Sequence, residues 1–516
     1  MNPAPASSQN LLSRLRAEAR ECLKQNDYQQ AIEILQRAHR LDPANDRILL
    51  ELGQANVMSY DFSAARKNFD QALRVSTSKP DALVAIGHHW MDIRCFATAA
   101  ECFEKVLQES RIPVVTFIRL GEMFIRLRRL DDAAAIAERA METHPDHEGV
   151  WLTRAKVHRH MKQWEPAEKL LRAVVSKSDG ATEARSAAGY ELGMVLDQEK
   201  RYDEAMAAWV EAKMRLRPGA APVMATLRAK LTQMKIIGET ISPTLVQRWR
   251  KAGVAELQPA RRIALLCGYA RSGTTLLEYV LDAHPQIVSA DETSVFQNRA
   301  YSLLTRSQSA KTSFLSALDW MSPRTLRQIR QDYVRGIESF LDQPVGDRLL
   351  LDKNPALTFD IPALSRFFPE IKFLVALRDP RDVCLSCFMQ ATPVVADSVP
   401  WLSLEGTINH YADMMNYWLA LKPSIGDAAI EVRYEDMVEN LEANARRTLG
   451  FLGCEWDERV LRFDEHARSK VVCSPTFVEV AKPVYKTSLG RWRNYQKYFE
   501  PYLEKLAPLL KAFGYD

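Results

Sequence analysis

The chain has 516 residues, of which 47% are hydrophobic and 26% are charged, and a formal net charge of +4. This length exceeds one ordinary core, so two or more domains are expected, and the small net charge gives no indication of wholesale nucleic-acid binding. No apolar run approaches the roughly 18 residues of a membrane span, and residues 1–14 lack a basic-then-apolar signal pattern, so we expect a cytoplasmic protein.

The N-terminal half repeats with a step of 34 residues. Small residues recur at this step, with one four-residue insertion before the last: Ala31, Ala65, Ala99, Ala133, Ala167 and Ala205. A second small residue stands twelve positions before five of them: Gly53, Gly87, Gly121, Ala155 and Gly193. Small residues let paired helices approach closely, and the pattern resembles the tetratricopeptide repeat over roughly residues 12–213.

Stacks of such repeats present a concave surface that commonly binds an extended peptide or a helix. The residues directly after the second set of small residues do not form a basic row, so no clamp for peptide carboxylates is visible. They are Gln54, His88, Glu122, Lys156 and Met194. The repeats serve either as an oligomerisation or scaffolding surface or as a recruiter of a substrate or protein partner. The sequence leaves both open.

The repeat register is lost between residues 214 and 259. A turn-rich break at residues 217–222 is followed by a helical pattern, which predicts a helical connector. The predicted domains are therefore a repeat domain over residues 1–213, a connector over 214–259 and a second domain over 260–516.

The second domain opens with a strand, a loop and a helix. Five apolar residues, 263–267, precede Gly268 and Gly273, and an amphipathic run follows over residues 275–284. Glycines allow a tight turn that aims backbone N–H groups and a helix N-terminus at one anion. The glycine spacing is that of a nucleotide P-loop, but Thr274 stands where an ATP-hydrolysing loop carries lysine.

Further strands or extended segments are predicted at residues 287–293, 348–355, 372–378 and 429–434. Because they alternate with helical patterns, we expect a parallel α/β sheet with its ligands at the strand C-termini. Four polar residues fall at such ends: Arg271, Lys353, Arg378 and Tyr434.

Residues 271–275 resemble the 5′-phosphosulfate loop of sulfotransferases, and residues 281–285 with 291–293 are similar to the tyrosylprotein branch of that family. The resemblance implies an all-α tetratricopeptide superhelix followed by a P-loop-like sulfotransferase domain that uses 3′-phosphoadenosine 5′-phosphosulfate (PAPS). It assigns the loop to the donor through Arg271, Ser272, Gly273, Thr274 and Thr275. A donor with one phosphosulfate needs less neutralisation than a triphosphate with Mg²⁺, which fits the missing lysine.

The resemblance assigns the donor's 3′-phosphate to Arg378 and Ser386. A guanidinium at a strand end can fork onto phosphate oxygens, and a helix hydroxyl can add a hydrogen bond; taken alone, the pair would suggest a surface ion pair. Tyr434 and Lys482 are further expected donor contacts, although a tyrosine at such a position can also be a core residue.

The same resemblance gives Glu292 the role of catalytic base and has Lys353, with Arg271, stabilise developing charge. A tyrosine hydroxyl, with a pKa of about 10, is a poor nucleophile until its proton is removed. Electrostatic stabilisation of a leaving oxygen is often a large catalytic contribution. The competing interpretations are that Asp291 and Glu292 cap the following helix and that Lys353 is a surface residue.

Two departures from the family pattern stand out. Tyr269 and Ala270 replace the aromatic-proline pair often found before the loop arginine, and Ser294 stands where tyrosylprotein enzymes carry an arginine on the acceptor side. Acidic tyrosine peptides are therefore not assumed as acceptors. Arg299 and Arg306 are candidates to replace that arginine.

No metal is predicted. The eight cysteines lack the spacing of a disulfide framework, and the ten histidines form no ligand motif. Cys384 and Cys387 form one C-x-x-C, which we interpret as two small buried helix residues because no second such motif accompanies it.

The sequence predicts a PAPS-dependent sulfotransferase that moves a sulfuryl group to an acceptor hydroxyl, protein tyrosine among the candidates. Two alternatives stay open. A P-loop kinase or NTPase would need a cation in place of the missing lysine. A non-enzymatic repeat scaffold would carry a degenerate nucleotide site.

Overall fold

The computed structural model describes residues 6–109, 112–177, 182–301, 313–391, 393–469 and 486–515. Its contacts divide the chain into two compact units. One comprises residues 1–129 and 293–346, and the other comprises residues 130–292 and 347–516. The domain bounds predicted from the sequence pattern stay a prediction.

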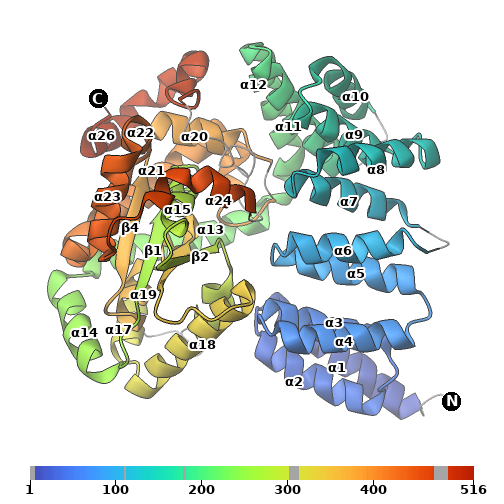
Figure 1. The fold of residues 1–516 in the computed structure, drawn as a ribbon, viewed down its shortest axis with the longest axis horizontal. Coiled ribbons are helices and arrows are strands. Elements are labelled where there is room, and N and C mark those ends of the chain that lie inside the picture. Colours follow the sequence, from blue (N-terminus) through green and yellow to red (C-terminus); the bar gives the residue numbers. More distant parts are fainter. Residues whose placement is uncertain are drawn as a thin grey trace. The chain divides into compact units, whose positions relative to one another are not determined.

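Within the described residues, the first unit contains the repeat helices α1 to α7, of which the first six stack in three antiparallel pairs (Figure 1). They are α1 (Ala6–Lys24), α2 (Tyr28–Leu41), α3 (Asp46–Met58), α4 (Phe62–Val75), α5 (Lys79–Asp92), α6 (Phe96–Val106) and α7 (Val114–Arg126). A Cβ on Gly53 would lie 2.0 Å from Phe69 Cε1, and one on Gly87 would lie 2.7 Å from Phe103 Cζ. The small residues are thus required because an aromatic ring from the paired helix fills their space.

Residues 293–346, between the strands β2 (Ile287–Asp291) and β3 (Leu349–Lys353), also belong to this unit. It forms η2 (Phe296–Tyr301), α17 (Phe314–Asp319) and α18 (Pro323–Leu341). It contacts the turn between α3 and α4: the Ser294 amide donates to the Tyr60 hydroxyl at 2.8 Å, and Ser339 Oγ donates to the Tyr60 carbonyl at 2.5 Å. An early repeat therefore holds this segment through a buried tyrosine.

The second unit begins with α8 (Leu130–Thr143), α9 (Glu148–His160), α10 (Trp164–Ser176), α11 (Thr182–Gln198) and α12 (Tyr202–Leu216). The interlocking recurs here, since a Cβ on Gly193 would lie 2.2 Å from Trp209 Nε1. Three helical elements follow: η1 (Arg217–Gly219), α13 (Ala221–Thr240) and α14 (Pro243–Glu256). The helix α14 contacts α19 (Ile361–Phe367), and both α13 and α14 contact α21 (Leu404–Ile425), so the expected connector is helical and packed.

Five parallel strands form one sheet in the order β2-β3-β1-β4-β5. Each begins and ends within two residues of an expected segment: β1 (Ile263–Gly268), β2 (Ile287–Asp291), β3 (Leu349–Lys353), β4 (Lys372–Leu377) and β5 (Ala429–Arg433). Every residue of β1 and β3 is buried, as expected for central strands of a parallel sheet covered on both faces. The predicted α/β class is confirmed.

Helices connect the strands and complete the C-terminal part. They are α15 (Thr274–Asp282), η3 (Pro355–Thr358), α19 (Ile361–Phe367), α20 (Pro380–Phe388), η4 (Val399–Leu402), α21 (Leu404–Ile425), η5 (Gly426–Ala428), α22 (Tyr434–Glu439), α23 (Leu441–Leu452), η6 (Glu458–Arg462), α24 (Phe463–Ser469), η7 (Arg491–Tyr495), α25 (Gln496–Phe499), η8 (Glu500–Tyr502) and α26 (Leu503–Phe513). The connection from β1 to β2 crosses the sheet in one direction, past β3. The connection from β3 to β4 crosses it in the opposite direction, past β1, and the chain continues to β5. Since such crossovers are right-handed, α15 and α19 cover opposite faces.

Among the described residues, no helix combines the length and the apolar character that crossing a membrane requires.

The last repeat packs against α20 through a buried lysine. Lys213 of α12 is 1% exposed, and its Nζ lies 4.8 Å from the ring centroids of both Tyr190 and Phe388. Burial lowers the pKa of this amine to about 7. In the unfolded chain the same amine has an ordinary pKa near 10.5, so folding displaces its proton above neutral pH.

We expect Lys213→Met to stabilise the protein at pH 7, because it removes the desolvation cost of a buried amine. Between about pH 7 and 10.5 the unfolded chain binds a proton that the folded chain does not, so this cost falls as the pH rises. The stability difference from wild type should shrink by about 2 kcal/mol between pH 7 and 9. Chemical unfolding at both pH values measures it. Lys169→Met, at an exposed position of α10, serves as the control, and a difference independent of pH would contradict the interpretation.

Candidate functional site

The loop after β1 turns through three residues with left-handed backbone: Gly268 (φ 126°), Arg271 (φ 69°) and Gly273 (φ 90°). A Cβ on Gly268 would lie 2.4 Å from the Ala376 carbonyl oxygen, and one on Gly273 would lie 2.5 Å from the Tyr434 ring. Both positions therefore need glycine. Ser272, Thr274 and Thr275 are buried where the loop enters α15, as an anion cradle at a helix N-terminus requires.

Hydrogen bonds from neighbouring elements hold this loop in place. The Thr358 hydroxyl donates to the Gly268 carbonyl at 2.6 Å and accepts from the Gly268 amide at 2.9 Å. The Tyr269 hydroxyl bonds His410 Nδ1 at 2.8 Å and accepts from Trp401 Nε1 at 3.0 Å. Burial lowers the pKa of His410 to about 4, so its imidazole is neutral at neutral pH. Tyr269 thus anchors the loop where the family pattern more often has an aromatic-proline pair.

Three carboxylates surround the Lys353 ammonium at the end of β3. Lys353 Nζ lies 2.5 Å from Asp291, 2.8 Å from Glu292 and 3.3 Å from Glu278. The sheet register explains the meeting, because Asp291 at the end of β2 pairs with Lys353, and the Glu292 amide donates to the Lys353 carbonyl at 2.8 Å. Glu292 has left-handed backbone (φ 44°), uncommon for a residue with a side chain.

Burial and charge act against each other in this cluster. Lys353 is fully buried, which by itself disfavours the ammonium, but Asp291, Glu278 and Glu292 hold the pKa of Lys353 well above its usual range. Burial and the nearby Asp291 raise the pKa of Glu278 well above its usual range. Glu278 Oε1 also accepts from the Ser289 hydroxyl at 2.5 Å. The lysine therefore stays a cation at neutral pH although it is buried.

The predicted 3′-phosphate residues also lie together. Arg271 Nε donates to Ser386 Oγ at 3.1 Å, and Arg378 Nη1 donates to the Arg271 carbonyl at 3.4 Å. The Arg378 guanidinium lies 4.9 Å from the Tyr434 ring centroid. Arg378 Nε is buried, and no described residue accepts a hydrogen bond from it. A buried donor of this kind fits a site for an anion, so these residues suit the phosphate of a nucleotide donor.

The structure places other predicted residues elsewhere or leaves them undescribed. Lys482 and Arg306 lie outside the described residues. Arg299 Nε donates to the Ser59 carbonyl at 2.5 Å, in the first unit. Asp291 and Glu292 form ion pairs with Lys353, and Lys353 is buried, so the surface interpretation of this lysine is wrong.

Sequence reasoning missed Glu278, Thr358 and Ser488. Glu278 is an acid within the otherwise apolar run of residues 276–281, which is a signal that the sequence offered, and nearly all of its helix is buried. Thr358 and Ser488 had no comparable signal, because their contacts with Gly268 and Tyr434 join segments far apart in the chain.

Cys384 and Cys387 are both buried on α20, as expected for small helix residues. Burial raises the pKa of Cys387 to about 12. Within the ranges that the structure describes, no group of three or more His, Cys, Asp or Glu side chains is arranged to hold a metal ion.

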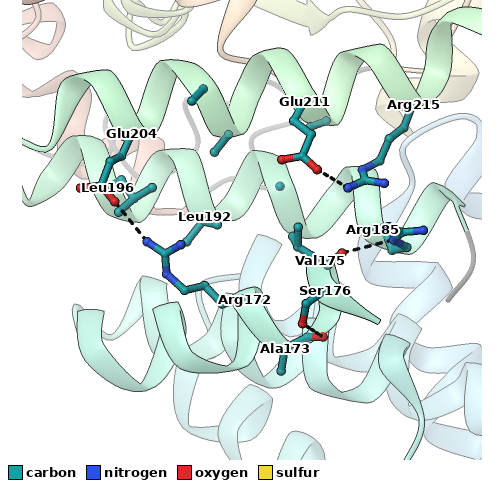
Figure 2. A pocket seen from close by; sticks show the side chains of 14 residues that line it. Arg172, Ala173, Val175, Ser176, Arg185, Leu192, Leu196, Glu204, Glu211 and Arg215 are labelled. Atoms are coloured by element: carbon teal, nitrogen blue, oxygen red, sulfur yellow. Dashed lines mark hydrogen bonds and ion pairs between the residues drawn. The ribbon is translucent and has the colours of Figure 1, made fainter. Parts of the chain in front are cut away.

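A separate hollow of about 570 Å³ lies between α10, α11 and α12, with Leu192 among its lining residues (Figure 2). Two of its arginines are paired with acids of the same lining: Arg172 with Glu204 at 3.3 Å, and Arg215 with Glu211. None of the predicted donor residues that the structure describes lines this hollow. It is therefore distinct from the edge of the sheet where those residues meet.

Two family models match the chain. The sulfotransferase family model matches residues 264–458, and a tetratricopeptide repeat model matches residues 23–86 and 124–188. The first range contains the loop, the five strands and Arg378, and the second covers much of the repeat region. The chain thus carries N-terminal tetratricopeptide repeats followed by a sulfotransferase-family α/β domain.

Several known proteins are similar to the chain. An uncharacterized protein of Aquifex aeolicus (strain VF5) is 23% identical over 449 residues, which cover 79% of this chain and 56% of that protein. Protein-tyrosine sulfotransferase A of Caenorhabditis elegans is 28% identical over 266 residues, covering 48% of this chain and 66% of that protein. Among solved structures, the sulfotransferase domain from the Synechococcus PCC 7002 olefin synthase is 23% identical with a TM-score of 0.33, covering 46% of this chain and 89% of that one. The chain spans about half to two thirds of the first two proteins.

We expect Lys353→Met to destabilise the protein by about 3 kcal/mol at pH 8, because it leaves buried carboxylates without their cation. Without the ammonium the folded-state pKa values of these acids rise. The folded chain then holds protons that the unfolded chain releases above about pH 4, so the loss should be smaller at pH 5 than at pH 8. Chemical unfolding at the two pH values measures this. Lys422→Met, which removes an exposed pair with Glu431, should cost less than about 1 kcal/mol at both.

Proposed function

We propose that this chain, which carries tetratricopeptide repeats and a sulfotransferase-family domain resembling protein-tyrosine sulfotransferases, transfers a sulfuryl group from PAPS to an acceptor hydroxyl. The observation that carries the proposal is the 2.8 Å contact between Lys353 and Glu292 at the sheet edge that also presents the glycine-bounded loop. A cation and a carboxylate there supply the two charges that such a transfer needs.

The loop supports binding of the donor's 5′-phosphosulfate. Its positive-φ residues turn the backbone toward the start of α15, where the helix N-terminus and its dipole favour an anion. The Thr274 and Thr275 hydroxyls and the Arg271 side chain add donors at the same place. Because Thr274 occupies the lysine position of a nucleotide P-loop, a triphosphate with Mg²⁺ is a poorer fit.

Arg378 and Ser386 are proposed to bind the donor's 3′-phosphate, with Tyr434 beside them. Arg378 is 8% exposed and keeps Nε without an acceptor among the described residues. Its guanidinium has five N–H donors, so it can bind phosphate oxygens in addition to its contacts with the Arg271 and Ser488 carbonyls. Arg271 Nε already donates to Ser386, which joins the two phosphate subsites through one hydrogen bond. Lys482 is proposed as a further donor contact on the strength of the family resemblance alone.

When bound, PAPS supplies an activated sulfuryl group whose departure leaves 3′-phosphoadenosine 5′-phosphate. Glu292 accepts the proton of the acceptor hydroxyl as the new S–O bond forms. Lys353, a cation at all ordinary pH values, stabilises the negative charge that grows on the leaving oxygen, with Arg271. In the structure Lys353 pairs with Glu292. During the reaction this contact is replaced: Glu292 contacts the acceptor hydroxyl, and Lys353 contacts the leaving oxygen.

Protein tyrosine is the first acceptor to test, because the similar protein of Caenorhabditis elegans is named a protein-tyrosine sulfotransferase. Ser294 replaces the arginine expected on the acceptor side, and Arg299 is bonded to a repeat carbonyl. The acceptor is therefore proposed only as a hydroxyl compound. The repeats are proposed to bind a protein, either the acceptor or a partner.

Glu292→Gln should lower transfer at least a hundredfold, because the amide cannot take up a proton, while leaving the affinity for 3′-phosphoadenosine 5′-phosphate nearly unchanged. Transfer of ³⁵S from labelled PAPS to tyrosine peptides, sugars and host extract measures activity, and calorimetry measures the nucleotide affinity. Glu435→Gln, at a carboxylate that bonds Tyr515, is the control. Full activity in the Glu292 variant would remove this residue from the reaction.

Arg378→Ala should lower the affinity for 3′-phosphoadenosine 5′-phosphate at least tenfold, because it removes a charged contact with the 3′-phosphate. Affinity for adenosine 5′-phosphosulfate, which has no 3′-phosphate, should change much less. Calorimetry with both nucleotides makes the comparison. An unchanged affinity for the first nucleotide would show that Arg378 does not bind the 3′-phosphate.

A further inference from the structure

A buried acid of the last repeat contacts the far C-terminal segment within one compact unit. Asp197, near the end of α11, is 6% exposed. Its Oδ1 accepts a hydrogen bond from the Tyr495 hydroxyl at 2.6 Å, and its Oδ2 pairs with Arg491 Nη2. Since a buried carboxylate must be compensated, this pairing fixes where residues 491–495 lie against the repeat.

Tyr495 is fully buried in the same contact. Its ring centroid lies 5.3 Å from that of Tyr202 and 5.8 Å from that of Trp209, both on α12. Burial and the neighbouring Asp197 raise the pKa of Tyr495 above its ordinary value, so the hydroxyl keeps its proton and acts as a donor. The segment is thus held by aromatic packing as well as by charge.

The backbone on either side of Arg491 is bonded to a second buried acid, Asp382 of α20. The Gly490 amide donates to Asp382 Oδ2 at 2.7 Å, and the Trp492 amide donates to Asp382 Oδ1 at 2.8 Å. Asp382 is 2% exposed in the first turn of α20. The turn formed by residues 488–492 is therefore clamped between the repeat and the helix that carries Ser386.

The same turn contacts two proposed donor residues. The Ser488 carbonyl accepts from Arg378 Nη2 at 2.5 Å, and the Ser488 hydroxyl bonds the Tyr434 hydroxyl at 2.7 Å. Asp382 lies 3.6 Å from Arg378. The orientation of the Arg378 guanidinium thus depends on where residues 488–492 lie.

We propose that Asp197 is a positioning residue: through Arg491 it fixes the turn at residues 488–492, and that turn aims Arg378 at the donor's 3′-phosphate. The last tetratricopeptide repeat is then a structural part of the donor site. This inference rests on the proposed function, because it needs Arg378 to bind that phosphate.

Asp197→Asn tests the inference in the full chain, since the amide keeps an acceptor for Tyr495 but loses the charge that pairs with Arg491. We expect the affinity for 3′-phosphoadenosine 5′-phosphate to fall about tenfold, because one charge-assisted phosphate contact is misaligned. Affinity for adenosine 5′-phosphosulfate should stay within about twofold. A role in folding alone would not separate the two nucleotides.

Asp203→Asn is the matched control, because Asp203 contacts the same C-terminal segment through Lys497 and Tyr498 at the surface and should leave both affinities unchanged. If Asp197→Asn does not fold, Arg491→Gln replaces it, because it removes the same ion pair from its more exposed partner and leaves the Tyr495 hydrogen bond in place. Two results would overturn the inference and leave the proposed function standing. In one, Asp197→Asn loses affinity for both nucleotides equally. In the other, Asp197→Asn keeps its affinity for 3′-phosphoadenosine 5′-phosphate while Arg378→Ala loses it. If Arg378→Ala keeps its full affinity for 3′-phosphoadenosine 5′-phosphate, both the phosphate assignment and the inference are rejected.

Discussion

The candidate site depends on one buried ammonium group. Lys353 has no exposed surface, and its charge is compensated by acids from two other elements, Glu278 of α15 and the Asp291–Glu292 pair at the end of β2. An unpaired charge at that depth would cost several kcal/mol, so the folded chain must bring these elements together. The same pairing holds Glu292 in a left-handed conformation that its side chain would otherwise disfavour.

The parallel sheet explains why the rest of the site meets there. In the order β2-β3-β1-β4-β5 the C-terminal ends of all strands lie at one edge. The connection after β1 runs toward β2, whereas the connection after its neighbour β4 runs the opposite way, toward β5. Such a switch point is where open α/β sheets bind ligands. The loop after β1, Lys353 after β3 and Arg378 after β4 follow from this topology.

The repeats are integrated into the protein rather than appended to it. Helices α8–α12 belong to the same compact unit as the sheet, and Lys213 and Asp197 of the last repeat are buried against α20 and the C-terminal segment. An early repeat similarly holds the segment after β2 through Tyr60. Buried polar contacts of this kind specify one packing, because any other arrangement would leave them unpaired.

The sequence by itself determined the features that local pattern encodes: the 34-residue repeat, the strand positions and the loop with glycines at residues 268 and 273. Family resemblance then named Arg271, Glu292, Lys353 and Arg378, and the structure brings Glu292 to Lys353 and Arg271 to Arg378. Only the tertiary structure revealed Glu278 beside Lys353, Thr358 on Gly268 and Asp197 on Arg491. Periodicity and turn chemistry act over a few residues and can be seen in one chain, whereas these contacts join segments tens to hundreds of residues apart. They exist because burial leaves each polar group only the partners that packing brings to it.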